Sequence, residues 1–302
     1  MTHPSKTCFI VNPSAKGDRA RSFLLSRQVW HSIGEILETR APGDGERLAA
    51  QAVQNGYTTI IAAGGDGTVL EVLNGIMRDS SYPERVRLGV LPLGTVNVFA
   101  KELRMPVSLE SCREVFIRSK TKEIDLPFVR FDHEHRGKSR RYFAQLGGAG
   151  LDALAIQAVD WELKKLFGPL AYVWAGLKVI CRELPFIQCR TGEGRQVNGT
   201  MVLIGNGSFY GGRFRVFPNA SLTDGLLHAL VFHRLHWSRL PALGMALCLN
   251  RLHLRHDVTY LQSTRFDLSA SRPIPFELEG DVVGCLPAQI EVSQTKLPVI
   301  VP

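Results

Sequence analysis

The sequence of 302 residues has no uninterrupted apolar stretch that is long enough to cross a bilayer. Its longest apolar run, residues 166–177, contains Pro169 and falls short of the roughly 18 to 20 residues that a membrane-spanning helix needs. The first apolar stretch, residues 8–11, is too short for the core of a signal peptide. We therefore expect a protein that neither spans a membrane nor is secreted.

The six cysteines form no Cys-x-x-Cys pair and have no regular spacing. We interpret them as reduced, buried thiols of a cytoplasmic protein. Internal repeats and low-complexity segments are also lacking. Hydrophobic residues make up 45% of the chain and charged residues 21%, a composition that excludes disorder, a collagen-like repeat and a coiled coil. The length suits about two globular domains.

Acidic side chains are outnumbered by basic ones, and the formal net charge is +8. This excess suits a polyanionic partner: nucleotide phosphate, an anionic bilayer surface or nucleic acid. Charge alone does not choose among the three. The basic tract at residues 251–256 fits either a solvated face or a contact with an anionic membrane.

The first 121 residues alternate strand-like apolar runs with amphipathic helical patterns, which is typical of βαβ units and a mostly parallel sheet. Expected strands cover residues 7–11, 33–38, 58–63 and 87–91, and expected helices cover 19–31, 44–55, 68–77 and 95–103. From about residue 122 the pattern becomes β-rich. Its expected strands cover 123–131, 142–146, 186–191, 195–206, 226–232, 258–268, 275–279 and 288–292, with helical insertions at 151–182 and 237–249.

The most informative motif is Gly64-Gly65-Asp66-Gly67-Thr68, which joins the third expected strand to a helix. Backbone N–H groups in such a glycine-rich turn, with the positive end of the helix behind them, form a phosphate cradle. The purely structural alternative is a tight turn that only caps the helix, but such a cap needs only one glycine. The motif is not a P-loop, because the Gly-Lys-Ser/Thr ending is missing.

Polar residues follow three other expected strands. Gly94, Thr95 and Asn97 form a second strand-to-helix turn, Thr39 ends the second strand, and residues 12–17 follow the first with Lys16 among them. Strand ends of a parallel sheet lie along one edge, so these groups can face a single crevice. Each turn alone has an ordinary structural explanation, whereas four together favour a ligand site.

The order of motifs resembles the diacylglycerol kinase catalytic-domain family, which includes bacterial diacylglycerol kinases and sphingosine-kinase-like lipid kinases. The N-terminal motifs are Asn12-Pro13-x-Ala15-x-Gly17, Gly64-Gly65-Asp66-Gly67-Thr68 with Glu71-Val72-x-Asn74-Gly75, and Gly94-Thr95-x-Asn97-x-Phe99-Ala100. The C-terminal motifs are Gly150-Leu151-Asp152-Ala153, Phe167-Gly168-Pro169-Leu170-Ala171-Tyr172, Gly211-Gly212, Pro218-x-Ala220, Asp224-Gly225-Leu226 and Glu279-Gly280-Asp281. NAD kinases and the wider phosphofructokinase-like group share the Gly-Gly-Asp-Gly-Thr motif, so the C-terminal motifs carry the specificity.

The resemblance implies an N-terminal α/β nucleotide-binding domain of the phosphofructokinase and NAD kinase type at residues 1–121. It implies a β-sandwich lipid-substrate domain at 122–286, with residues 287–302 returning to the first domain and the active site between the two. The implied ATP contacts are Asn12, Pro13, Ser14, Ala15, Lys16, Thr39, Gly64, Gly65, Asp66, Gly67, Thr68, Val69, Leu70, Thr95 and Asn97. Asp224, with Ser221 and Leu226, is the implied Mg²⁺ site.

The general base of this family comes from an Asp-Gly-Glu motif, and here the sequence is Glu279-Gly280-Asp281. Asp281 is one methylene shorter than Glu but still accepts a proton if the backbone approaches more closely. Asp66 is a rival base or metal contact. Leu70 and Val98 stand where the family usually has Asn and Asp.

The resemblance therefore implies an ATP- and Mg²⁺-dependent lipid kinase. Its acceptor is a hydroxyl of a diacylglycerol-like or sphingoid lipid at a membrane surface, with peripheral contact to the inner face and no nucleic-acid partner. A NAD kinase-like enzyme and a catalytically impaired nucleotide- or lipid-binding regulator are the alternatives. The sequence leaves open which lipid is used and whether the chain forms a homodimer.

Overall fold

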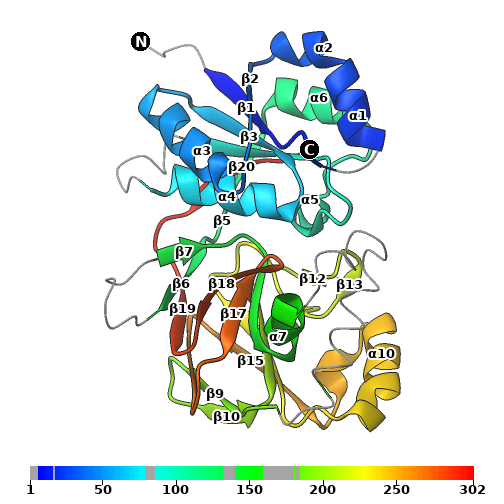
Figure 1. Cartoon of the computed structure of the whole chain (residues 1–302), viewed down its shortest axis with the longest axis vertical. Coiled ribbons are helices and arrows are strands. Elements are labelled where there is room, and N and C mark those ends of the chain that lie inside the picture. Colours follow the sequence, from blue (N-terminus) through cyan, green and yellow to red (C-terminus); the bar gives the residue numbers. More distant parts are fainter. Residues whose placement is uncertain (1–5, 16–17, 79–85, 132–139, 159–179, 181–183) are drawn as a thin grey trace. The chain divides into compact units, whose positions relative to one another are not determined.

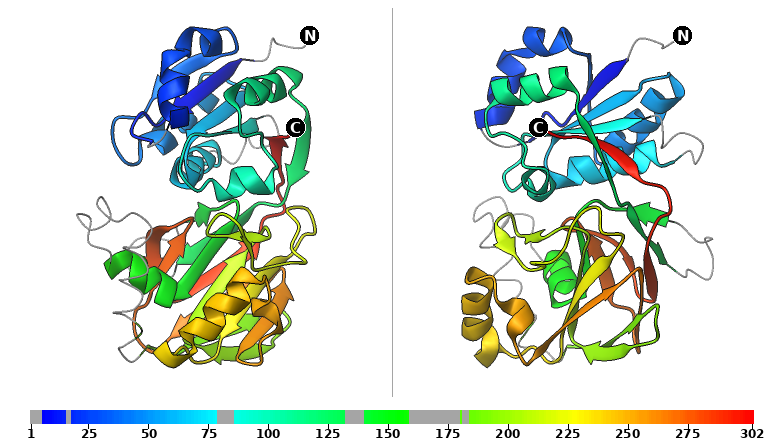
Figure 2. Two further views of the ribbon diagram at one scale, coloured as in Figure 1. Left: turned by 90° about the vertical axis from the view of Figure 1, so that its right-hand side faces the viewer. Right: turned by 180° about the vertical axis from the view of Figure 1, so that it is seen from behind.

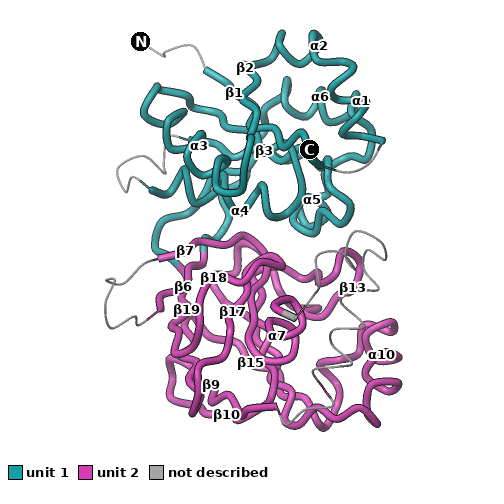
Figure 3. Tube along the Cα trace, viewed as in Figure 1, with its two compact units in different colours: residues 1–126, 293–302 teal, residues 127–292 magenta. Residues whose placement is uncertain are grey.

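The computed structural model describes residues 6–15, 18–78, 86–131, 140–158, 180 and 184–302. The chain divides into two compact units, residues 1–126 with 293–302 and residues 127–292 (Figure 3). The first unit extends beyond residue 121 because strand β5 (Thr121–Ile124) pairs with the C-terminal strand β20 (Leu297–Ile300). The returning segment begins at 293 rather than 287, since β19 (Ala288–Val292) pairs inside the second unit.

The first unit is built on a six-stranded sheet with the order β2-β1-β3-β4-β20-β5. Its parallel strands are β1 (Thr7–Val11), β2 (Glu35–Glu38), β3 (Thr59–Gly64) and β4 (Arg87–Pro92). β20 runs parallel to β4 and antiparallel to β5. β3 is buried along its whole length, as expected of a central strand covered on both faces.

Helices cover both faces of this sheet (Figure 1). On one face Phe9 of β1 contacts aromatic rings of α1 (Asp18–Leu25), α2 (Arg27–His31) and α6 (Leu109–Arg118). The other face carries α3 (Asp44–Gln54) and α4 (Asp66–Ile76), and the short helix α5 (Val98–Glu102) follows β4. The sequence predicted one helix over 19–31, but the Ser26 hydroxyl donates to the Ser22 carbonyl at 2.8 Å and two helices result.

The second unit, which Figure 2 shows from two further sides, is rich in strands. They form two six-stranded antiparallel sheets with the orders β10-β9-β16-β19-β6-β7 and β15-β14-β11-β8-β17-β18. The first sheet is completed by β6 (Pro127–Phe131), β7 (Arg140–Tyr142), β9 (Ile187–Thr191), β10 (Gln196–Gly199) and β16 (Arg265–Ala270). The second comprises β8 (Leu146–Gly150), β11 (Met201–Gly205), β14 (Leu227–Phe232), β15 (Val258–Ser263), β17 (Pro275–Leu278) and β18 (Asp281–Cys285). Phe131 and Phe276 pack between the sheets with ring centroids 5.8 Å apart. The expected α/β unit and β-sandwich are thus confirmed.

Several expected elements of this unit differ in detail. The runs 123–131, 195–206 and 258–268 each form two strands, broken at 125–126, at Thr200 and at Thr264. Strand β18 of this unit was not expected, and neither was helix α6 of the first unit. The insertion at 151–182 begins as α7 (Leu151–Ala158), and most of its remainder lies outside the described residues.

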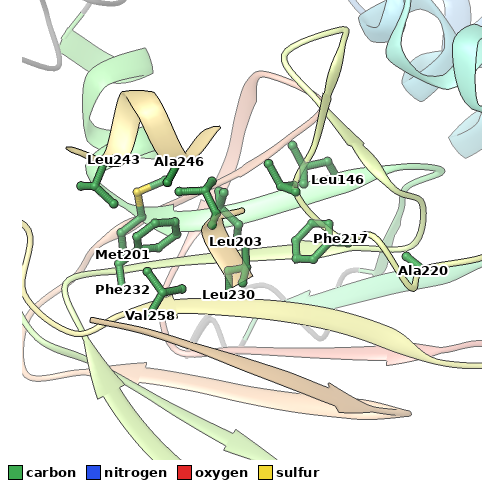
Figure 4. Packing of buried hydrophobic residues seen from close by; sticks show 12 residues of the cluster. Leu146, Met201, Leu203, Phe217, Ala220, Leu230, Phe232, Leu243, Ala246 and Val258 are labelled. Atoms are coloured by element: carbon green, nitrogen blue, oxygen red, sulfur yellow. The ribbon is translucent and has the colours of Figure 1, made fainter. Parts of the chain in front are cut away.

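A second hydrophobic cluster covers the outer face of the β8-containing sheet (Figure 4). Leu203 and Leu230 point from neighbouring strands into this cluster, where Phe217 and residues of α10 (Leu240–Cys248) close over them. The hairpin β12 (Phe209–Tyr210) and β13 (Phe214–Arg215) also packs against it. In the part of the chain that the structure describes, no helix is long and apolar enough to cross a membrane.

Candidate active site

Four strand ends of the first unit are aligned. The register places Glu38, Val11, Ala63 and Leu91 side by side across β2, β1, β3 and β4. The residues that follow them lie along one edge of the sheet, and they include Thr39, Asn12 and Gly64. Backbone bonds from Thr39 to Val11 (2.9 Å) and from Asn12 to Ala63 (3.0 Å) extend the alignment past the strand ends. The structure therefore brings these predicted residues together.

The turn after β1 is held by the Asn12 side chain. Its Oδ1 accepts a hydrogen bond from the Ser14 N–H at 2.9 Å, and its carbonyl accepts one from the Ala15 N–H at 3.1 Å. Pro13 and Ser14 are exposed, so this turn is accessible at the edge of the sheet. Lys16, which was expected to supply charge to a phosphate, lies outside the described residues.

The two glycine turns contact one another. The Gly64 carbonyl accepts hydrogen bonds from the N–H groups of Leu93 (3.0 Å) and Gly94 (3.2 Å). A Cβ on Gly94 would lie only 2.6 Å from the Gly65 Cα atom, and a Cβ on Gly64 only 2.3 Å from the Thr68 hydroxyl oxygen. A larger residue at Gly94 would push the two turns apart, and one at Gly64 would displace Thr68 at the start of α4.

The N-terminus of α4 points its first N–H groups out of this turn. Its N-cap is Gly65, which has no side chain to bond them, so the N–H groups of residues 66–68 remain for a ligand at the positive end of the helix. The side chains of Thr68, Val69 and Leu70 are buried, and the Val69 N–H is bonded to the Gly65 carbonyl. Any nucleotide contact from Val69 or Leu70 is therefore not through the side chain.

The Asp66 carboxylate joins the two turns. Its oxygens accept hydrogen bonds from the N–H groups of Val98 (3.0 Å) and Phe99 (3.2 Å), which begin α5. Burial raises the pKa of Asp66, and these two N–H groups and the Lys101 charge act against that rise. Asp66 is thus a capping group for α5, a role that its motif does not reveal.

Asn97 and Thr95 differ in exposure. Asn97 is buried and has a left-handed backbone (φ 55°), and its Nδ2 donates to the Gly94 carbonyl at 2.6 Å. Its side chain therefore shapes the second turn. Thr95 is exposed and is the accessible hydroxyl of that turn.

In the second unit, Asp281 stands at the end of a tight hairpin. Glu279 and Gly280 connect β17 to β18 with φ values of 52° and 91°, and Leu278 pairs with Asp281. Two consecutive positive φ values are those of a type I′ turn, which suits the right-handed twist of the strands. Asp281 is exposed.

The carboxylate of Glu279 anchors this hairpin to the neighbouring β8 segment. Its Oε1 accepts hydrogen bonds from the N–H groups of Ala144, Gln145 and Leu146 at 3.2, 2.7 and 3.3 Å. A carboxylate that accepts several backbone bonds is held in place. The first acidic residue of the motif is therefore an anchor, and the second is the one that reaches solvent.

Glu277 is a buried carboxyl directly beneath the hairpin. Its Oε2 accepts the Gly280 N–H at 2.8 Å, and its Oε1 makes no hydrogen bond with the described residues. Burial raises the pKa of Glu277 well above its usual range, and the nearby carboxyl of Asp152 raises it further. Burial also raises the pKa of Asp152, which accepts a hydrogen bond from the Tyr210 hydroxyl at 3.0 Å.

The expected metal loop is organised by Asp224. Its Oδ1 accepts the Leu226 N–H at 2.9 Å, and its Oδ2 accepts the Ser221 N–H at 3.1 Å. The buried His228 ring contacts the same Oδ2 at 3.0 Å through Nε2. The structure thus brings the three predicted metal residues together, and no cluster of three or more His, Cys, Asp or Glu occurs among the described residues.

The structural roles of two carboxylates, Glu71 and Glu277, were not expected from the sequence. Glu71 accepts the N–H groups of Gly43 and Gly45, both at 2.8 Å, at the start of α3. Its partners are distant in sequence, so no local signal revealed the contact. Glu277 did leave a signal, because it is a charged residue inside an otherwise apolar strand.

Family models cover most of the chain. Residues 6–129 match the diacylglycerol kinase catalytic domain, and residues 147–301 match the YegS C-terminal NAD kinase beta sandwich-like domain. A diacylglycerol kinase of Staphylococcus carnosus is 28% identical over 83% of this chain and 78% of its own length. The corresponding enzyme of Staphylococcus haemolyticus is 29% identical over 83% of this chain and 73% of its own.

Solved structures have the same fold. A diacylglycerol kinase from Bacillus anthracis strain Sterne superposes with a TM-score of 0.71 at 19% identity, covering 100% of this chain and 98% of its own. Another crystal structure from that strain gives a TM-score of 0.78 at 22% identity and covers 99% of this chain and 95% of its own. With both family models matched in order, the chain belongs to the diacylglycerol kinase family and is a lipid kinase.

Proposed function

We propose that this kinase uses ATP and transfers its γ-phosphate to a hydroxyl of a diacylglycerol-like or sphingoid lipid. The observation that carries the proposal is the pair of contacting glycine turns beside the open N-terminus of α4. The relatives named diacylglycerol kinase support the choice of acceptor. The family itself shows only the coarser activity, that of a lipid kinase.

The first unit would hold the phosphates. Backbone N–H groups of residues 66–68 and the positive end of α4 offer hydrogen bonds and charge stabilisation without needing a flexible side chain. The exposed Thr95 hydroxyl and the turn at residues 12–15 lie at the same edge of the sheet and would complete the nucleotide contacts. Phosphoryl transfer depends mainly on such positioning and electrostatics.

Asp281 would accept the proton of the lipid hydroxyl. It is exposed at the end of a hairpin whose geometry is fixed by Glu277 and Glu279. Asp66 is less suited to this role, because both of its oxygens already accept backbone N–H groups. A base must reach its substrate by hydrogen bonding before its pKa matters.

The 221–226 loop fits a Mg²⁺ ion only in part. Oδ2 of Asp224 already accepts two groups, whereas Oδ1 accepts one and keeps a lone pair. Mg²⁺ in proteins is commonly held by one or two carboxylates and retains several waters. Asp224 Oδ1 would hold it, with the Ser221 hydroxyl and the Leu226 carbonyl as candidate neighbours. When bound, Mg²⁺ would supply positive charge that organises the loop.

We further infer that the protein works as a peripheral protein at the inner face of a membrane, with lipid rather than nucleic acid as its partner. An acceptor lipid resides in the bilayer, whereas ATP is dissolved in the cytoplasm. The formal charge of +8 favours an anionic surface.

The test is a transfer assay with γ-labelled ATP against diacylglycerol, a sphingoid base, total lipid extract and NAD. Label in a lipid product is the expected result, and it should disappear in Asp281→Asn. Label in NAD alone would identify an NAD kinase. ATP or lipid binding without transfer to any acceptor would identify a regulator, and either result would overturn the proposal.

A further inference from the structure

Helix α10 has no charged side chain, yet most of it lies at the surface of the second unit (Figure 1). Only Leu243 and Ala246 are buried within the helix, and the Met245 side chain is 62% exposed. A helix that is hydrophobic on all sides is normally buried on all sides. The outer face of α10 is thus apolar surface that the described residues leave in contact with water.

Large exposed side chains also occur in the segments that flank α10 in sequence. Trp237, in the short helix η2 (Trp237–Arg239), is 60% exposed, and Leu254, in η3 (Leu252–Leu254), is 68% exposed. Leu249, which caps α10, is 55% exposed. We name Trp237, Met245, Leu249 and Leu254 the apolar patch. It holds four of the twelve large hydrophobic residues that are exposed in the described part of the chain, all within 18 residues of sequence.

The segment that carries the apolar patch is rich in basic residues. Residues 233–256 include four arginines and four histidines but no Asp or Glu. Arg239 and Arg255 share the buried carboxylate of Asp257, with closest approaches of 3.4 and 2.8 Å. The remaining two, Arg234 and Arg251, are exposed. Four arginines against one aspartate leave three formal positive charges at this surface.

We propose that the apolar patch and its arginines form a docking surface for an anionic lipid bilayer. Tryptophan favours the boundary between lipid and water, and an apolar helix face with arginines beside it is the pattern of a helix that lies in the membrane surface. A second copy of this chain would fit poorly, because a two-fold contact pairs the same surface of both copies and would bring two positively charged surfaces together. The proposal rests on the proposed function in one respect: an enzyme with a lipid acceptor must reach that lipid in a membrane.

Binding should have two separable components. An arginine near an anionic surface contributes about 1 kcal/mol, so removing one should weaken binding about fivefold at low salt. The apolar component should not depend on salt, since it arises from burial of side chains in the bilayer. Together they predict tight binding to anionic vesicles and weaker binding to neutral ones.

The experiment is sedimentation of the full chain with phosphatidylglycerol–phosphatidylcholine vesicles that contain neither ATP nor diacylglycerol. Arg234→Gln with Arg251→Gln should weaken binding about 25-fold at low salt, twice the single-arginine effect on a logarithmic scale. Trp237→Ser with Met245→Ser and Leu254→Ser should weaken it at least about tenfold at every salt concentration. Controls in the first unit are Arg118→Gln and Val107→Ser, which change an exposed arginine and an exposed apolar residue outside the apolar patch and should leave binding unchanged.

A fluorophore on Cys248 gives a direct readout of insertion. This thiol is exposed on α10, which contradicts the expectation that the cysteines are all buried. Cys8, Cys112 and Cys189 are buried, and Cys285 is half-buried. An environment-sensitive label there should shift its emission to the blue when anionic vesicles are added, and a Cys248→Ser sample measures background labelling. Circular dichroism of each variant shows whether it is folded.

Unchanged vesicle binding by the folded apolar triple variant would overturn the proposal. So would a dimer that dissociates in that variant, because the patch would then be covered by a second copy. Since no ATP is present, the result is independent of catalysis. If the protein phosphorylates lipid in detergent but the substitutions do not change its binding to vesicles, the docking surface alone is contradicted. If it binds vesicles through the patch but phosphorylates no lipid, the proposed function alone is contradicted.

Discussion

At the sheet edge of the first unit, the carboxylates of Asp66 and Glu71 both accept backbone N–H groups, whereas the β17–β18 hairpin of the second unit exposes Asp281. The surface that the first unit offers to a ligand there is mostly backbone N–H groups and hydroxyls. The second unit also has anchoring carboxylates, Glu277 and Glu279, but these support a third one that reaches solvent.

The two regions separate acidic residues that hold backbone in place from one that is accessible to a substrate. A carboxylate whose oxygens are bonded to backbone N–H groups holds a turn, and its removal damages structure and activity together. An exposed carboxylate on a fixed hairpin can be removed with little effect on folding. Substitutions in the two regions should therefore give different combinations of activity and stability.

The largest combined effect should come from Asp66→Ala. It deprives the Val98 and Phe99 N–H groups of their acceptor, so we expect phosphate transfer to fall at least about 10³-fold and the free energy of unfolding to fall by about 1–3 kcal/mol. Turnover at saturating ATP and urea denaturation measure the two. Asp267→Ala, which removes a partly exposed ion pair with Arg265 and a hydrogen bond from Gln289, is the control and should cost about 1 kcal/mol or less. Wild-type turnover in Asp66→Ala would refute the phosphate-loop assignment.

Gly64→Ala should rank next. The added Cβ would meet the Thr68 side chain at 2.3 Å, so we expect a loss of about 1–3 kcal/mol in stability and weaker ATP binding as the turn is displaced. Calorimetric titration with ATP and thermal denaturation test both. Gly244→Ala in α10, where no atom lies within 4 Å of the new Cβ, should be neutral or slightly stabilising. Equal behaviour of the two variants would contradict the close contact between Gly64 and the Thr68 side chain.

Glu277→Gln should change the pH dependence of stability. Burial raises the pKa of Glu277 in the folded state, so the folded protein keeps this carboxyl protonated at a pH where the unfolded chain has lost the proton. The wild type therefore loses stability as the pH rises from the ordinary pKa of 4.5 toward the raised pKa. Gln keeps an acceptor for the Gly280 N–H without ionising, so the variant should lose less stability above that pH, by up to about 1.4 kcal/mol per pH unit. Urea denaturation from pH 4 to 9 measures this, with Asp267→Asn as an exposed control. Parallel curves for wild type and Glu277→Gln would argue against a protonated buried carboxyl.

Glu71→Gln should have the smallest effect. The amide retains one oxygen acceptor for the Gly43 or Gly45 N–H but places an NH₂ group against the other, which should cost about 1 kcal/mol in stability. Turnover should stay near wild type, because Glu71 bonds the start of α3 and not the glycine turns. Glu110→Gln, on the exposed first turn of α6, is the control. A large loss of turnover without a loss of stability would place Glu71 in the site itself.

The glycine turns were predictable from sequence because their cause is local. Gly64 and Gly94 follow short apolar runs, and parallel strands necessarily end at one edge. The roles of Asp66 and Glu279 could not be predicted, because their N–H partners lie more than 30 and more than 130 residues away in sequence, respectively. Strand β18 was missed because its exposed and half-buried residues have no clean alternation.

The most direct test of this account compares wild type with Asp281→Asn in labelled phosphate transfer to diacylglycerol, together with the affinity for ATP. If Asp281 removes the hydroxyl proton, kcat should fall by about 10² to 10⁴ while ATP affinity and stability stay near wild type, and Asp281→Glu should remain active. The contradicting result is a nearly normal kcat for Asp281→Asn together with an Asp66→Asn variant that binds ATP but transfers no phosphate. It would show that the proton leaves through Asp66 and that the hairpin does not supply the base.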